Sequence, residues 1–132
     1  MTLYTRKKIL LIHSQQPANQ YSGGAEGVID SEQHWMRRLA EEVFDLVKDL
    51  GHDVRLGPLG HSYRDNVAWV QRPENRDAAL VLSLHSNATA TAGDASVGIG
   101  VYHHPSSAKG RVFAEALVPL LAPVAATGRA YR

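Results

Sequence analysis

The chain has 132 residues, a normal size for one domain and too few for two ordinary ones. Apolar residues make up 44% of the sequence, which is enough for a hydrophobic core and excludes an intrinsically disordered protein. The net charge is only +1 and the charged residues are scattered, which argues against a dedicated nucleic-acid-binding protein. Because cysteine is absent, any metal must be bound by nitrogen and oxygen ligands, and the seven histidines make such a site worth testing.

The first predicted elements are a buried strand and a long helix. Lys8–His13 contains a continuous run of branched apolar residues and ends in histidine, which is typical of a strand buried on both faces. A polar loop is predicted over residues 14–27. A helix then begins near Glu32, among acidic and capping residues, and ends at Gly51. Its predicted apolar face has spacings of three and four and consists of Met36, Leu39, Val43, Leu46, Val47 and Leu50.

A second set of elements follows that helix. Asp53–Leu56 alternates as a short strand, and Gly57 with Pro58 ends it. The polar segment 60–77 predicts a loop and an irregular helix interrupted near Pro73. Ala79–His85 is another buried apolar run, and it also ends in histidine.

The last predicted elements are a strand over Gly98–Tyr102 and a helix from Ala108 to about Val118, limited by Pro119 and Pro123. Strands and helices alternate throughout the sequence. This order predicts an α/β fold in a single domain, residues 1–132, with a mostly parallel or mixed central sheet of about four strands and helices on both faces.

Three metal-ligating side chains are expected at one edge of this sheet. His13 and His85 each follow a buried strand, and ligand sites in parallel sheets gather at the carboxyl ends of the strands. Glu32 begins the helix that follows the first strand, so it is expected at the same edge. Two histidines and a carboxylate, with water in the fourth position, form an established catalytic zinc set. Spacing alone leaves a structural interpretation open for each residue. His13 and His85 can each be a polar strand end, and Glu32 can be an acid favoured at a helix N-terminus.

The motifs around these residues are similar to those of a known family. Ile9–His13 is followed by the glycine-rich Gly23–Ala25, and Glu32 stands at the head of an amphipathic helix that Gly51 closes. Leu82–Ala88 reads Leu-Ser-Leu-His-Ser-Asn-Ala and is the most specific stretch. From Lys8 to about Arg129 the chain resembles the zinc-dependent N-acetylmuramoyl-L-alanine amidases, which include bacterial cell-wall amidases and phage endolysins.

The resemblance implies one Zn²⁺ per chain, held by His13, Glu32 and His85. It further implies a hydrolase that cleaves the amide between N-acetylmuramic acid and L-alanine in peptidoglycan, its expected partner. Asn87 and Ser83 would contact the substrate, and each also has an interpretation as a turn or strand residue.

The sequence departs from the family pattern in two places. Ile12 and Ser14 stand where a glycine usually flanks the first zinc histidine. The family also carries a catalytic glutamate on a strand beyond the final helix, whereas no acidic residue follows Glu115 in this chain. The catalytic acid is therefore not identified, and Glu26 is the first substitute candidate, with a solvated loop acid as the alternative.

Several interpretations of function stay open. The chain is a C-terminally truncated amidase, a shortened amidase that recruits another acid, or a non-catalytic zinc-containing module that binds the cell wall. A structural protein with incidental histidines would hold no metal. The four apolar residues Ile9–Ile12 are too few for a signal peptide, and no stretch is long enough for a membrane span. The sequence therefore suits a phage lysin that acts on the cell wall, or a protein that stays cytoplasmic until released, and it leaves the oligomeric state open.

Overall fold

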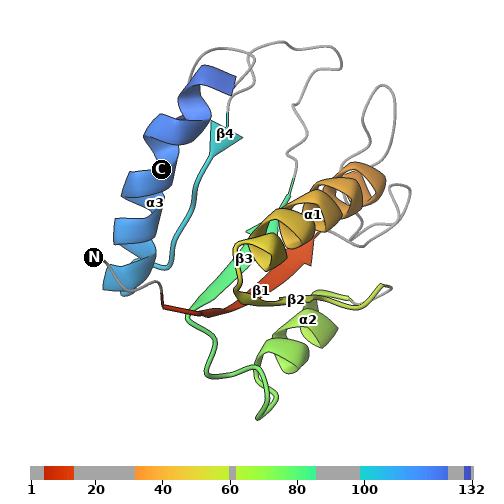
Figure 1. Cartoon of the computed structure of the whole chain (residues 1–132). Helices are drawn as coiled ribbons and strands as arrows, with labels where there is room; N and C mark the ends of the chain where they lie inside the picture. The colour runs from red at the N-terminus through yellow and green to blue at the C-terminus, as the bar shows by residue number, and fades with distance from the viewer. Residues whose placement is uncertain (1–4, 14–31, 60–61, 86–98, 125–129, 132) are drawn as a thin grey trace. The chain divides into compact units, whose positions relative to one another are not determined.

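A computed structural model of the chain describes residues 5–13, 32–59, 62–85, 99–124 and 130–131 (Figure 1). For residues 32, 33, 130 and 131 the description covers the backbone only. The chain divides into two compact units, Met1–Ala88 and Thr89–Arg132. The first unit contains a parallel sheet and both helices that cover it.

The sheet of the first unit has three parallel strands in the order β2-β1-β3. β1 is Lys8–His13, β2 is Asp53–Leu56 and β3 is Leu80–Leu84. The central strand is the apolar run predicted to be buried, and Leu10 and Leu11 within it are fully buried. The predicted α/β class and the parallel sheet are therefore confirmed.

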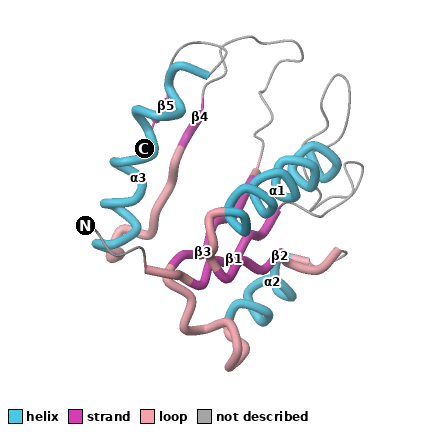
Figure 2. Tube along the Cα trace, in the orientation of Figure 1, coloured by secondary structure: helices cyan, strands magenta, loops and turns pink. Residues whose placement is uncertain are grey.

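Two helices cover opposite faces of this sheet (Figure 2). α2, Tyr63–Val70, places Trp69 in a core cluster with Leu10 and Ile12 of β1. α1, Glu32–Asp49, contacts the other face, where Arg37 reaches His13. Because successive side chains of a strand point to opposite faces, residues 10 and 12 face α2 whereas residue 13 faces α1. The prediction of helices on both faces is confirmed.

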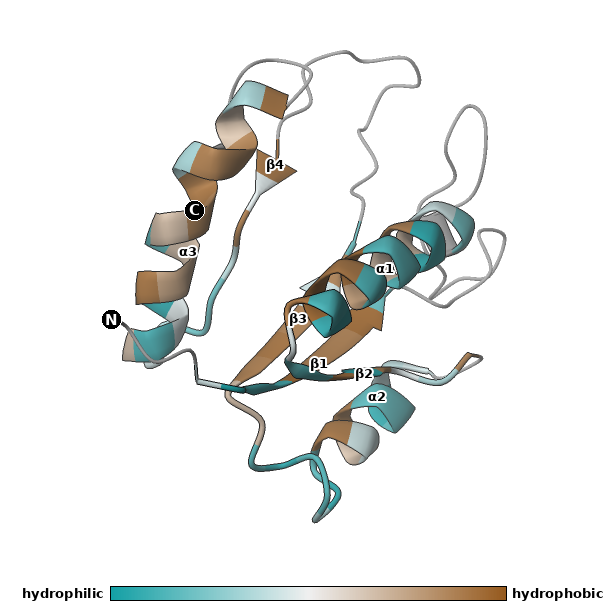
Figure 3. Cartoon of the chain, viewed as in Figure 1, coloured by the Kyte–Doolittle hydropathy of each residue, from teal (hydrophilic) through white to brown (hydrophobic). Residues whose placement is uncertain are grey.

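The apolar face of α1 is narrower than the sequence pattern indicates. Ala40 is fully buried and Met36, Val43 and Val47 are half-buried, as a stripe facing the sheet requires. Leu39, Leu46 and Leu50, which the pattern assigned to the same face, are 41%, 64% and 64% exposed. The line of contact between α1 and the sheet instead runs through Ala40, whose small side chain is fully buried. Figure 3 shows the contrast between the hydrophobic middle of β1 and the mixed surface of α1.

Local signals define the helix ends of this unit. Gly51 follows α1 with a φ of 89°, the left-handed conformation that glycine adopts at low cost, and its N–H donates to the Lys48 carbonyl. Ser62 and Asp65 form a capping box at the start of α2, in which each side chain accepts the backbone N–H of the other residue. The expected end at Gly51 and the short helix before Pro73 are therefore confirmed.

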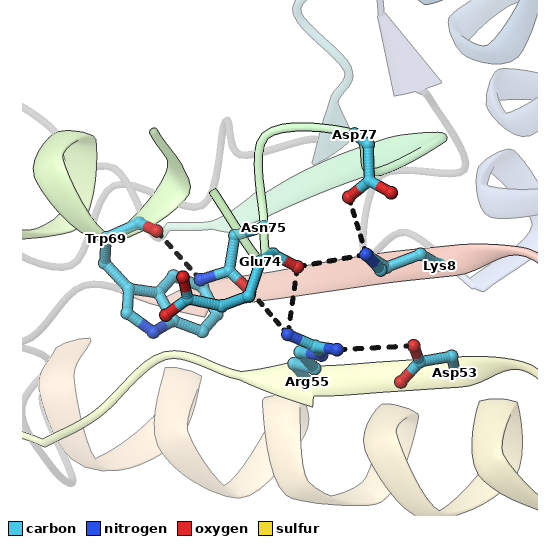
Figure 4. Close-up of polar contacts among 7 residues, drawn as sticks. All are labelled: Lys8, Asp53, Arg55, Trp69, Glu74, Asn75 and Asp77. Carbon is cyan, nitrogen blue, oxygen red and sulfur yellow. Dashed lines mark hydrogen bonds and ion pairs between the residues drawn. The ribbon is translucent and has the colours of Figure 1, made fainter. Parts of the chain in front are cut away.

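A polar cluster ties the segment after α2 to the sheet (Figure 4). The side chain of Asn75 is 2% exposed; its Nδ2 donates to the Trp69 carbonyl at 2.8 Å, and its Oδ1 accepts from Arg55 Nη1 at 3.0 Å. The Glu74 carbonyl accepts from Arg55 Nη1 and from Lys8 Nζ, both at 3.0 Å. These bonds link α2 to β1 and β2 and satisfy polar groups beside the core.

The second unit has two short parallel strands and a helix. β4, Ile99–Gly100, pairs with β5, Ala130–Tyr131, and α3 spans Ala108–Leu121 before a short 3-10 turn, Ala122–Val124. The predicted strand over Gly98–Tyr102 is therefore only two residues long in the described structure. It pairs with β5, a strand that the sequence analysis missed, instead of adding a fourth strand to the first sheet.

α3 ends later than the sequence predicts. Pro119 lies inside the helix, which continues to Leu121, whereas the sequence analysis placed the helix end before it. Pro119 has no N–H to donate to the carbonyl of Glu115, so the last turn of α3 lacks one i→i−4 hydrogen bond. Among the described helices, none is long and apolar enough to cross a membrane.

The Asn75 cluster predicts a specific loss of stability. Asn75→Ala would remove both bonds of a buried amide and leave the Trp69 carbonyl without that donor, which should cost about 1–3 kcal/mol of unfolding free energy. Asn66→Ala is a matched control, because Asn66 Oδ1 is buried without a hydrogen-bond partner in the described structure. We expect Asn66→Ala to stay within about 0.5 kcal/mol of wild type in urea unfolding. Equal losses in both variants would contradict this account.

The ion pair between Lys8 and Asp77 predicts a pH dependence of stability. The hydrogen bond from Lys8 Nζ, at 2.5 Å, holds the pKa of Asp77 below its ordinary value of 3.8. A lowered pKa in the folded state stabilises the protein fully above pH 3.8, and this contribution disappears as the pH falls through the folded value. Asp77→Asn should therefore be less stable than wild type near about pH 6, and the difference should shrink as the pH falls below 3.8. A difference that is constant across this range in urea unfolding would refute the assignment.

Candidate metal centre

The two histidines of the predicted zinc site lie at neighbouring strand ends. His13 is the last residue of β1, and the register of β1 with β3 places it beside Leu84. His85 directly follows Leu84 in the sequence. The parallel pairing of β1 with β3 therefore brings the two residues to the carboxyl edge of the sheet, as the sequence predicts.

The start of α1 extends beyond that edge. Arg37, in the second turn of α1, contacts His13, and Glu32 is the first residue of the helix. The backbone of Glu32 is therefore about 7.5 Å further along the helix axis than that of Arg37, at 1.5 Å per residue. The side chain of Glu32 lies outside the described part of the structure.

His13 is fully buried and its Nε2 atom lies 3.2 Å from Nη1 of Arg37. A guanidinium group can only donate, so Nε2 accepts this hydrogen bond and the neutral ring carries its proton on Nδ1. Arg37 is held in turn by Glu41, whose Oε1 lies 2.6 Å from Nε, and by the Gly57 carbonyl, 3.4 Å from Nη1. We refer to Arg37, His13, Glu41 and Gly57 as the arginine clamp.

His85 has a different environment. It is exposed, and its Nε2 lies 2.8 Å from Oγ of Ser83. Ser83 is paired with Ile12, whose side chain packs against Trp69 on the α2 side of the sheet. The contact with Ser83 therefore turns His85 towards the α2 side, whereas His13 faces α1. The two imidazoles share an edge of the sheet, but they face different sides of it.

The complete ligand set falls partly outside the described residues. Over residues 5–13, 32–59, 62–85, 99–124 and 130–131, no three histidine or acidic side chains are grouped as a metal ion would require. Because the side chain of Glu32 is not among those described, the three-ligand zinc site stays a prediction. The proposed catalytic substitute Glu26 and the proposed substrate contact Asn87 also lie outside the described residues.

The donor types nevertheless suit zinc. Neutral imidazole and carboxylate are ordinary ligands of Zn²⁺, and a ring with its proton on Nδ1 is the tautomer that can offer Nε2. Coordination by Nε2 of His13 requires Arg37 to leave that atom. Sequence reasoning missed Arg37, because an arginine on a helix is ordinarily solvated, and only the packing of α1 on β1 brings it to the histidine.

Two further histidines accept hydrogen bonds from the backbone. Nδ1 of His52 accepts the backbone N–H of Lys7 at 3.1 Å. Nδ1 of His104 accepts the backbone N–H of Ser106 at 3.2 Å, and the hydroxyl of Ser106 lies 2.7 Å from the same atom. Each bond organises backbone at a turn or strand start, so these residues serve as comparisons for the two at the sheet edge.

The contrast in burial predicts different chemical reactivity. Diethyl pyrocarbonate, which acylates accessible imidazole nitrogens, should modify His85 in the folded zinc-free protein and leave His13 unmodified, because the ring of His13 is fully buried. Mass spectrometry of proteolytic peptides measures both sites, and denatured protein, in which both should react, is the control. Equal modification of the two residues in folded protein would contradict the described burial.

Comparisons with known proteins give no relative for this chain. No family model, no curated protein and no solved structure matches it. The resemblance to the amidases therefore depends on the sequence motifs alone, and membership of that family stays a prediction.

Proposed function

We propose that this chain is a zinc-dependent N-acetylmuramoyl-L-alanine amidase that hydrolyses peptidoglycan. The observation that supports it best is the pairing of β1 with β3, which brings the histidines of both motifs to neighbouring strand ends. The helix that begins at Glu32 also has its N-terminal end beyond the same edge, since Arg37 in its second turn contacts His13. Topology and motif thus agree on the edge of the sheet at which the site would lie. Binding of one zinc ion by both histidines would require His85 to leave Ser83 and turn towards His13.

In this proposal His13, Glu32 and His85 hold the zinc ion. Zinc bound there would polarise the scissile carbonyl and lower the pKa of a water molecule towards about 7. The overall reaction adds water across the amide, so that the muramic acid keeps a carboxylate and L-alanine leaves with a free amino group. The leaving nitrogen must gain a proton, and Glu26 is the first candidate donor by its position in the sequence between β1 and α1.

The second candidate function is a zinc-containing module that binds the cell wall without cleaving it. This alternative rests on the catalytic acid, which the sequence motifs do not identify in this chain. Both functions require zinc and peptidoglycan, and only the first releases stem peptides.

The proposal predicts the products of a digestion. Purified peptidoglycan treated with the zinc-loaded chain should release stem peptides that begin with L-alanine, detected by mass spectrometry. His85→Ala should abolish both this release and the binding of one zinc per chain, because an imidazole ligand is lost. His52→Ala is the matched control and should retain both, since His52 precedes β2 at the amino edge, where its Nδ1 accepts the backbone N–H of Lys7.

Each outcome separates the alternatives. Zinc bound without any release of stem peptides would reject the amidase and leave the wall-binding module as the remaining candidate. Zinc retained at one per chain in His85→Ala would reject the ligand assignment. A wild-type chain that binds no zinc would reject both functions.

A further inference from the structure

The arginine clamp places a cation on Nε2 of His13, a residue that the proposed function assigns to a metal. Arg37 has only 25% of its side-chain surface exposed, and its guanidinium group reaches three acceptors. These are Glu41 Oε1 at 2.6 Å, His13 Nε2 at 3.2 Å and the Gly57 carbonyl at 3.4 Å. The acceptors come from the helix itself, from β1 and from the residue after β2, so the group is held from three directions.

The contact and metal coordination exclude one another. A neutral imidazole has one nitrogen lone pair in the ring plane, and in this structure Arg37 donates into it. A metal ion needs the same lone pair, and it would meet a positive charge at hydrogen-bonding distance. Zinc can therefore bind Nε2 of His13 only after the guanidinium group has moved away.

The geometry also provides a path for that movement. Glu41 binds Nε, whereas His13 and Gly57 both bind Nη1. Glu41 lies one helical turn from Arg37 and its side chain is 53% exposed. The ion pair with Glu41 can therefore be kept while the outer end of the guanidinium group turns away from His13, because the pair does not use Nη1.

From these contacts we infer that Arg37 competes with zinc for Nε2 of His13, so that metal binding is coupled to displacement of the Arg37 guanidinium group. This inference rests on the proposed function, which makes His13 a zinc ligand. It assigns Arg37 a regulatory role at the site, because the arginine lowers the affinity for zinc by donating to the nitrogen that the metal would use.

The first test compares zinc affinities in competition with a chromophoric chelator. Arg37→Met keeps an unbranched apolar stem similar to the aliphatic part of arginine and removes the competing donor. It should bind zinc roughly 10-fold or more tightly than wild type, since a hydrogen bond from a charged group is usually worth at least one factor of ten. Arg111→Met is the matched control: Arg111 makes the same i,i+4 pair with Glu115 in α3, without a histidine contact in the described part of the chain.

The competition would be overturned if Arg37→Met bound zinc with the affinity of wild type or more weakly, or if Arg111→Met gained as much affinity as Arg37→Met. Each of these results would leave the zinc site in place. Absence of zinc binding in wild type and Arg37→Met alike would instead reject the proposed function and the competition together. The two failures are therefore distinguishable.

A second measurement uses the wild-type chain, so it does not depend on the folding of a variant. Nitrogen-15 NMR of the imidazole rings in the zinc-free wild-type chain should show His13 with a protonated Nδ1 and an unprotonated Nε2. One equivalent of zinc should shift Nε2 of His13 and the side-chain nitrogens of Arg37 together, since displacement of one accompanies binding at the other. A proton on Nε2 in the zinc-free chain, or an Arg37 signal unaffected by bound zinc, would overturn the inference.

Discussion

The burial of β1 between two helices is the constraint on which the rest of this structure depends. A central strand covered on both faces must send alternate side chains to different helices. Leu10 and Ile12 therefore pack with Trp69 of α2, whereas His13 faces α1 and meets Arg37. The strand ends where the apolar run ends, so the hydrophobic core itself fixes a histidine at the carboxyl edge of the sheet. The position of the candidate site is a consequence of how the core is built.

Much of this arrangement could be predicted from local sequence, because the signals involved are local. An apolar run defines β1, and a glycine with positive φ ends α1. The exposure of Leu39 on α1 and the continuation of α3 through Pro119 could not be predicted, since tertiary packing decides both. The contact between Arg37 and His13 is of the same kind: it joins residues 24 apart in sequence, and no periodicity in either segment marks it.

The candidate site combines two opposed requirements. A buried neutral histidine needs hydrogen-bond partners, and Arg37 supplies one for Nε2 of His13. A zinc ligand needs that same nitrogen to be available. His85 meets a different partner, the hydroxyl of Ser83, on the other side of the sheet. Metal binding by both histidines would thus replace existing hydrogen bonds on each, so the zinc-loaded and zinc-free proteins are expected to differ in side-chain arrangement at this edge.

The central claim is that His13, Glu32 and His85 together bind one zinc ion at the carboxyl edge of the sheet. X-ray absorption at the zinc K edge, on the chain loaded with one equivalent of zinc, tests this claim without depending on activity. The account predicts about four nitrogen and oxygen ligands at roughly 2.0–2.1 Å, with the scattering pattern of two imidazole rings. A shell of oxygen ligands alone, without imidazole scattering, would contradict it.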